Sequence, residues 1–160
     1  MKKVNQIVKH PLYQESMRVI KEAEKERIFC KHDMAHCLDV ARLAYIYNLE
    51  EHTELSREII YGAALLHDIG RYLQDTKEIP HHEASVGMAE KILPECGFSE
   101  EEQTMIIEAI LLHRREGTKK EKSLRDFIYK ADKASRPCFD CLAKGDCKWH
   151  EENMNLEISY

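Results

Sequence analysis

The stretch ALLHDIGRYL, residues 64–73, sets a histidine and an aspartate into the middle of an apolar, helix-like run. These two residues are His67 and Asp68. Burying an ionisable pair beside leucines costs several kcal/mol unless other groups compensate for it. Gly70, which follows closely, leaves room for another backbone or a substrate to approach. We therefore expect the fold to bring polar partners from elsewhere in the chain to His67 and Asp68.

The segments around this stretch have helical rather than alternating patterns of apolar residues. Ser99 followed by Glu102 is a capping-box signature, which predicts that a helix begins there. A polar loop is expected over DTKEIPHHE, residues 75–83. Helices are predicted from Pro11 into the charged segment KEAEKER, and over about 34–49, 56–73, 82–93, 100–113 and 124–135. Because no strand-like alternation of useful length occurs, the predicted fold class is all-α.

The composition narrows the class of protein. The chain has 160 residues, 33% of them charged, and a net charge of −5, which suits one globular domain with its own core. Proteins that bind duplex nucleic acid carry a basic stripe, and none is present here. No apolar stretch approaches the length of a membrane span. We expect a cytoplasmic protein without membrane contact, whose six cysteines are reduced thiols or metal ligands.

Six ionisable residues lie where the helical pattern points toward the buried side of the predicted helices. Each one alone is more often a hydrogen-bonded core histidine, a helix cap or a surface charge. Together they would leave several ionisable groups unpaired in one interior, which is costly. A divalent transition metal such as Fe, Mn, Zn, Ni or Co would satisfy them, because imidazole and carboxylate are suitable ligands. The candidate ligands are His36, His67, Asp68, His81, His113 and Asp132.

Five motifs carry these residues in the order H…HD…H…H…D: KHDMAHCLDVARLA (31–44), AALLHDIGRYL (63–73), IPHHEASVGMAEKIL (79–93), IIEAILLHRREG (106–117) and YKADKASR (129–136). From about Cys30 to Arg136 this series resembles the HD-domain superfamily of metal-dependent phosphohydrolases. A further His-Asp dipeptide, His32-Asp33, is interpreted as a decoy. The resemblance implies a helical bundle of about six or more helices, with an HD domain over residues 1–137 and a Cys-rich tail over 138–160 packed on it.

The resemblance also assigns roles to the candidate ligands. It implies that the core metal ligands are His36, His67, Asp68 and Asp132. Dinuclear members have two further histidines between the HD pair and the last aspartate, and His81 and His113 match them, with His82 as a competitor for His81. Six candidate ligands favour two ions over one. Asp68 would then be a ligand, the bridge between the ions and the catalytic residue.

The implied reaction is hydrolysis of a phosphomonoester or pyrophosphate bond by a metal-activated water. The expected partner is a small phosphorylated substrate, in particular a nucleotide. Arg71 and Lys133 are candidates for binding its phosphate, and Arg114 or Arg115 are weaker ones. Two alternatives stay open. A mixed-valence di-iron oxygenase of the same superfamily has the same ligand set, and a non-catalytic module would bind a nucleotide or use the metal for stability.

The tail segment RPCFDCLAKGDCKWH, residues 136–150, departs from the generic HD pattern. Its C-x2-C-x5-C-x2-H spacing suits a tetrahedral zinc site formed by Cys138, Cys141, Cys147 and His150. The three cysteines could equally hold an iron–sulfur cluster, with Cys30 or Cys37 as the fourth ligand. The remaining interpretation is a tail of reduced thiols that packs through Phe139 and Trp149. The ending resembles that of a bacterial subgroup of the superfamily, which leaves the substrate open.

Overall fold

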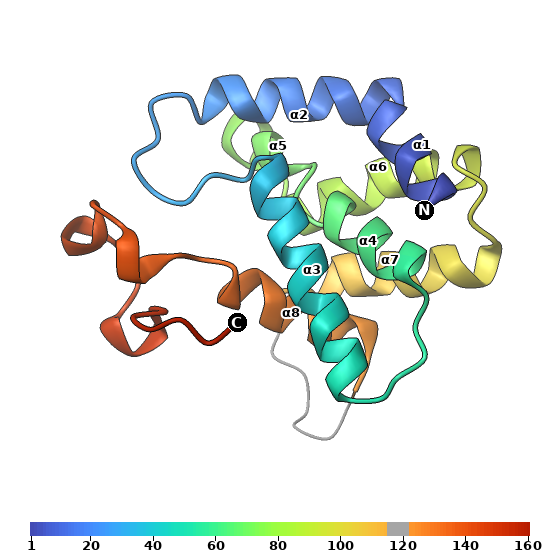
Figure 1. Cartoon of the computed structure of the whole chain (residues 1–160). Helices are drawn as coiled ribbons and strands as arrows, with labels where there is room; N and C mark the ends of the chain where they lie inside the picture. Colours follow the sequence, from blue (N-terminus) through green and yellow to red (C-terminus); the bar gives the residue numbers. More distant parts are fainter. Residues whose placement is uncertain (115–121) are drawn as a thin grey trace.

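The computed structural model of the chain describes residues 1–114 and 122–160. Within these residues it contains helices and no strand, which confirms the all-α prediction. Short 3-10 helices occupy the tail: η1 (Cys138–Asp140), η2 (Lys144–Asp146) and η3 (Glu151–Asn153). The α-helices, in chain order in Figure 1, are α1 (Lys2–Lys9), α2 (Pro11–Ala23), α3 (Met34–Glu50), α4 (Arg57–Leu66), α5 (Arg71–Lys77), α6 (His81–Glu95), α7 (Glu100–Leu112) and α8 (Leu124–Ala134).

Helix α4 forms the centre of the bundle. Most of its residues from Ile59 to Leu66 are buried, and it contacts α1, α3, α7 and α8. On one side α3 packs along α8, on the other α6 packs along α7, and α2 lies across α5 and α6 (Figure 1). His67 and Asp68 directly follow α4. The buried helix therefore positions this pair near the ends of several other helices.

The single helix predicted over residues 56–73 is wrong, because a turn at residues 67–70 separates α4 from α5. The Gly70 N–H donates to Ser85 Oγ at 2.9 Å instead of continuing the helical ladder. A Cβ added at Gly70 would lie only 2.5 Å from the Ser85 backbone nitrogen. The absence of a side chain at Gly70 therefore lets the first turn of α6 approach closely. This contact holds α6 against residues 67–70.

Other helix bounds agree with the sequence pattern or differ locally. Ser99 and Glu102 form the predicted capping box at the start of α7. The loop predicted over 75–83 is wrong over most of its length, because α5 continues to Lys77 and α6 begins at His81. Helix α1 was not predicted, since only Val4 and Ile7 are buried in its eight residues. No helix of the described residues is long and apolar enough to cross a bilayer.

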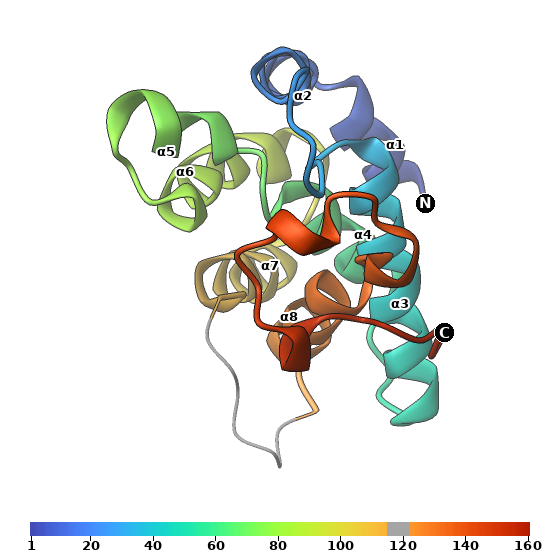
Figure 2. The same cartoon turned by 90° about the vertical axis from the view of Figure 1, so that its left-hand side faces the viewer.

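The tail returns over α8 and α3 (Figure 2). The Asn155 side-chain amide donates to the backbone carbonyls of Lys133, Ala134 and Arg136, at 2.8, 3.2 and 2.9 Å. At the chain end the Tyr160 hydroxyl donates to Glu50 at 3.3 Å. None of the residues 138–160 is buried, so these polar contacts rather than an apolar core hold the tail in place.

Candidate metal centre

The six candidate ligands come from five separate places in the fold and meet in one cluster. His36 lies in the first turn of α3, where the Asp33 side chain caps the helix by accepting the His36 N–H. Five of the six are buried, and the His36 side chain is 11% exposed. The other five are His67 and Asp68 after α4, His81 at the start of α6, His113 after α7 and Asp132 in the last turn of α8.

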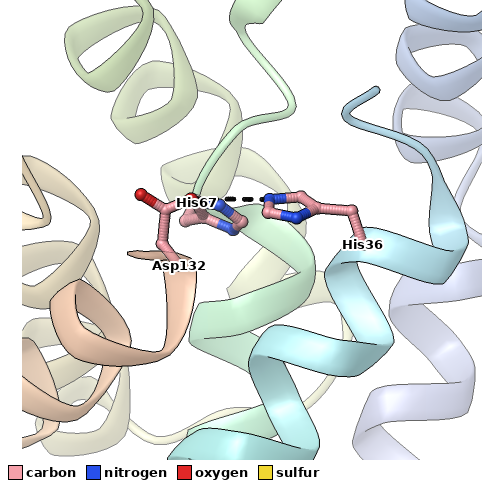
Figure 3. A group of neighbouring side chains, drawn as sticks. All are labelled: His36, His67 and Asp132. Carbon is pink, nitrogen blue, oxygen red and sulfur yellow. Dashed lines mark ion pairs between the residues drawn. The ribbon is translucent and has the colours of Figure 1, made fainter. Parts of the chain in front are cut away.

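The first half of the cluster is the trio His36, His67 and Asp132, shown in Figure 3. Each residue offers one ligand atom, and these atoms all lie within 4.8 Å of one another. The closest approach between His36 and Asp132 is 3.6 Å, from Nε2 to Oδ1. Two imidazole nitrogens and a carboxylate oxygen at this separation suit one divalent transition metal ion.

The second half of the cluster is the trio Asp68, His81 and His113, which satisfies the same spacing. Asp68 Oδ1 lies 3.3 Å from His81 Nε2 and 3.6 Å from His113 Nε2. The two histidine Nε2 atoms are 3.3 Å apart. The other oxygen of Asp68, Oδ2, lies 3.4 Å from His67 Nε2. Asp68 therefore belongs to the second trio through Oδ1 and faces His67 of the first trio through Oδ2.

Each of the four histidines is oriented by a hydrogen bond on the side away from the cluster. The Nδ1 atoms donate to oxygens, which leaves each Nε2 lone pair directed at the centre, the arrangement usual for metal-binding histidines. Ser135 Oγ donates to the Asp132 carbonyl, so it is an acceptor for His36. The acceptors are Ser135 Oγ for His36 at 3.3 Å, the Ala64 carbonyl for His67 at 2.7 Å, Gln74 Oε1 for His81 at 2.6 Å and the Ile110 carbonyl for His113 at 2.6 Å.

The protonation states suit metal ligands as well. Burial lowers the pKa of His36 to about 4 and that of His81 to about 3, and it also lowers the pKa of His67. Burial opposes ionisation of Asp68, but the histidines that face it, His67 first, hold its pKa well below the usual value. At neutral pH these imidazoles are uncharged and the carboxylate is charged, and metal binding requires both conditions.

Three polar atoms of the cluster are buried without a hydrogen-bond partner among the described residues: His36 Nε2, His67 Nε2 and Asp68 Oδ1. A buried acceptor without a partner costs about 1–3 kcal/mol. All three atoms are electron-pair donors, and all three face the centre of the cluster. A divalent cation would satisfy them together, so the residues fit the metal that the motifs imply.

Comparisons with known proteins identify the family of the chain. The family model of the HD domain matches residues 34–137. The chain belongs to the HD-domain family. An uncharacterised protein of Clostridium beijerinckii is 43% identical over 140 residues, which span 88% of this chain and 87% of that one. The crystal structure of a predicted HD superfamily hydrolase from an uncultured Thermotogales bacterium shares the fold, with a TM-score of 0.60 and 23% identity over 89% of this chain and 81% of that one.

The HD-domain structure distinguishes the two neighbouring histidines at the start of α6. His81 is 3% exposed and directs Nε2 at Asp68 and His113, whereas His82 belongs to neither trio. Consecutive residues point about 100° apart around a helix, so only one of these two neighbours can direct its ring at the cluster. The hydrogen bond between Gly70 and Ser85 holds this end of α6 against the turn that carries Asp68.

A pocket of about 470 Å³ opens above the centre of the HD domain. Among the described residues, its only carboxylates are Asp68 and Asp132. Lys133 forms an ion pair with Asp132, and Arg136, which sequence reasoning did not single out, lies 3.5 Å from the same Asp132 oxygen. Of the cations considered from the sequence, Arg115 lies outside the described residues. The cations that line the pocket are Arg27, Arg71, Arg114, Lys133, Arg136 and Lys148.

Sequence reasoning also missed the pair Glu24 and His32. Glu24 is 8% exposed and accepts two hydrogen bonds from His32, one from Nδ1 at 2.5 Å and one from the backbone N–H at 2.7 Å. His32 Nε2 lies 3.8 Å from Asp68 Oδ2 and lines the pocket. The dipeptide interpreted as a decoy, His32-Asp33, thus places His32 beside the candidate metal centre. Glu24 gave no signal, because it lies in a run of charged residues that is typical of a solvated helix face.

Proposed function

We propose that the protein is a metal-dependent phosphohydrolase that cleaves a phosphomonoester or pyrophosphate bond of a small phosphorylated substrate, in particular a nucleotide. The observation that carries this proposal is that four residues of the His/Asp cluster, namely Asp68, His81, His113 and Asp132, line the same pocket as six cations. The whole chain has a net charge of −5, so this local excess of positive charge is specific to the pocket. It favours an anionic substrate.

In this proposal His36, His67 and Asp132 would hold one ion, and His81, His113 and Asp68 would hold a second ion. Asp68 would be shared between the two sites, because its Oδ2 faces His67 and its Oδ1 faces His81. Bound there, the ions would supply a water activated at neutral pH and would polarise a phosphoryl oxygen. The histidine Nδ1 hydrogen bonds fix the ligand rings in place before any substrate arrives.

The cationic wall orients the substrate in this proposal. Lys133 and Arg136 lie beside Asp132, and Arg71 lies beside His81, so these side chains can bind phosphate oxygens on either side of the centre. Guanidinium groups bind such oxygens with paired, directional hydrogen bonds. His32, held by Glu24, is a positioning residue on the Asp68 side of the pocket.

The test begins with metal analysis of protein purified without chelator. A panel of phosphomonoesters, nucleotides and pyrophosphates is then offered under Mn, Fe, Co, Ni and Zn in turn, in the absence of oxygen. Release of phosphate or pyrophosphate with at least one metal is the expected result. Turnover that needs iron and oxygen and releases no phosphate would contradict the proposal and favour the di-iron oxygenase. Tight nucleotide binding without hydrolysis under every metal would contradict it in favour of a binding module.

A further inference from the structure

A second group of metal-binding side chains lies outside the His/Asp cluster. Cys30 lies in the segment between α2 and α3, and Cys138, Cys141 and Cys147 lie in the tail, about 110 residues later. In Figure 2 the tail approaches the segment between α2 and α3. Cys30, Cys138 and Cys147 line the same pocket. Burial raises the pKa of Cys30, and so do the neighbouring Cys138 and Cys141 thiols, so all four cysteines share one neighbourhood.

The structure separates these four cysteines from the other candidate ligands. Cys37 and Cys96 are buried in the helical core, with exposures of 2% and 1%. His150 lines a different hollow, beside Tyr129 and Lys130. Of the fourth ligands that the spacing allows, Cys30 is therefore the one that lies with the tail cysteines.

The spacing of the sulfurs distinguishes the kinds of thiolate site. A zinc ion with bonds of about 2.3 Å to four thiolates draws their sulfurs to about 3.8 Å from one another. Among the described residues, no three cysteine sulfurs lie within 4.8 Å of one another, although the His/Asp trios do meet that spacing. A cubane cluster holds its thiolates farther apart, because each thiolate binds a different iron. The sulfurs of the described cysteines are thus not drawn together as four thiolates on one zinc ion would be, and the wider spacing of a cluster is compatible with this.

The charges around the cysteines also suit an anionic cluster. Arg136 lowers the pKa of Cys30 against the effect of burial, and Arg27 Nε donates to the Cys30 carbonyl at 2.8 Å. The Arg136 guanidinium lies 3.7 Å from the centre of the Trp149 ring, so it is held between the tail and the pocket. Two fixed cations would offset the negative charge that four thiolates bring to an iron–sulfur cluster.

We propose that Cys30, Cys138, Cys141 and Cys147 bind a [4Fe–4S] cluster that fastens the tail to the segment between α2 and α3. The cluster has a structural role. It joins two distant parts of the chain and holds Arg136 and Trp149 in the wall of the substrate pocket. It does this with ligands that take no part in the His/Asp centre.

The test is analysis of iron and acid-labile sulfide in the full chain purified without oxygen. We expect about four sulfides per chain, together with the broad visible absorption of a cubane cluster. Sulfide is the decisive quantity, because iron alone could occupy the His/Asp centre. Cys138→Ser and Cys147→Ser should each lower the sulfide content about tenfold. Cys37→Ala and Cys96→Ala are the matched controls and should retain it.

The sulfide content is independent of phosphohydrolase activity, so this proposal and the proposed function can fail separately. Asp132→Ala should impair the His/Asp centre and leave sulfide unchanged. Stoichiometric zinc without sulfide in anaerobically purified protein would overturn the cluster. So would thiols that remain free after reconstitution with iron and sulfide. Loss of sulfide from the Cys37 and Cys96 controls while their far-ultraviolet circular dichroism stays unchanged would also overturn the assignment of these four ligands.

Discussion

The His/Asp centre and the cysteine-bearing tail both gather metal-binding side chains, but the chain builds them in opposite ways. The centre draws its ligands from the ends of helices that share one apolar core, and hydrogen bonds orient each histidine before a ligand binds. The tail consists of short 3-10 turns without a buried residue, and its order depends on polar contacts and, in our proposal, on a cluster bound by its cysteines. We therefore expect damage to the centre to affect chemistry and damage to the tail to affect substrate binding.

The largest effect is expected at Asp68. Asp68→Ala removes the carboxylate that faces both trios and leaves several histidines without their charged partner. Turnover should fall by at least about 10³-fold, and bound metal should be lost. Metal analysis and steady-state kinetics measure both, with the exposed Asp39→Ala as the matched control. Full activity in Asp68→Ala would end the hypothesis of a metal-dependent centre.

The next largest effect distinguishes the two neighbouring histidines of α6. His81→Ala removes a nitrogen that lies 3.3 Å from Asp68, so metal affinity should fall at least about 10- to 100-fold, and turnover with it. His82→Ala changes a residue that is in neither trio and should retain most metal. Titration of both metal-free variants with Mn or Co gives the comparison. Equal losses in the two variants would contradict the assignment of His81.

A smaller effect is expected from the pair behind the centre. Glu24→Gln weakens the hold on His32 while preserving the size of the side chain. Turnover should fall about tenfold at unchanged metal content, as is typical when a hydrogen-bonded partner behind a site is altered. The exposed Glu26→Gln is the control on the same segment. If Glu24→Gln loses metal as Asp68→Ala does, Glu24 supports the metal site itself rather than the substrate.

Acidification should destabilise the metal-free centre. The pKa values of His36 and His81 fall on folding from 6.5 to about 4 and about 3, mainly through burial. The unfolded chain therefore binds more protons below pH 6.5, and the free energy of unfolding falls as the pH drops from about 6.5 to about 4. The slope per histidine is at most about 1.4 kcal/mol per pH unit.

Urea unfolding of metal-free protein at several pH values measures this loss. His36→Asn should flatten the dependence, whereas His150→Asn in the exposed tail should leave it unchanged. The same slope in the wild type and His36→Asn would show that burial of His36 does not set the acid limit of the fold.

The smallest effect is expected in the tail. Asn155→Ala removes the amide that binds three carbonyls at the end of α8, at a cost of about 1 kcal/mol. Metal content should be unchanged, and KM should rise a few-fold because Arg136 and Trp149 are held less firmly. The nearby Asn153→Ala is the control. A loss of bound metal in Asn155→Ala would break the distinction between centre and tail.

The sequence was most informative where local chemistry sets the structure. The helical periodicity and the capping box at Ser99 predicted most elements, and the motif order singled out the residues that meet in the two trios. The break after α4 could not be read in this way, because apolar residues at helical spacing, Leu66, Ile69 and Leu73, continue across it. Only the approach of Ser85 to Gly70, fifteen residues apart in sequence, reveals the turn.

The remaining gaps have the same origin. Glu24 looks like a surface charge until the loop that follows it places His32 beside Asp68. The spacing of the tail cysteines fits several metal sites, and the choice among fourth ligands depends on where Cys30 lies in space. In both cases the contact joins segments that are not part of one periodic pattern, so the sequence pattern could not predict it.

The Asn155 amide also affects the order in which contacts can form during synthesis. It binds the carbonyl of Lys133, 22 residues earlier, and Lys133 directly follows the candidate ligand Asp132. During synthesis the end of α8 cannot acquire this cap until Asn155 has left the ribosome. The trio that Asp132 completes also includes His36, from the first quarter of the chain. The candidate ligands His36, His67 and Asp132 can therefore meet before this cap forms, and the end of α8 is fastened only after Asn155 has emerged.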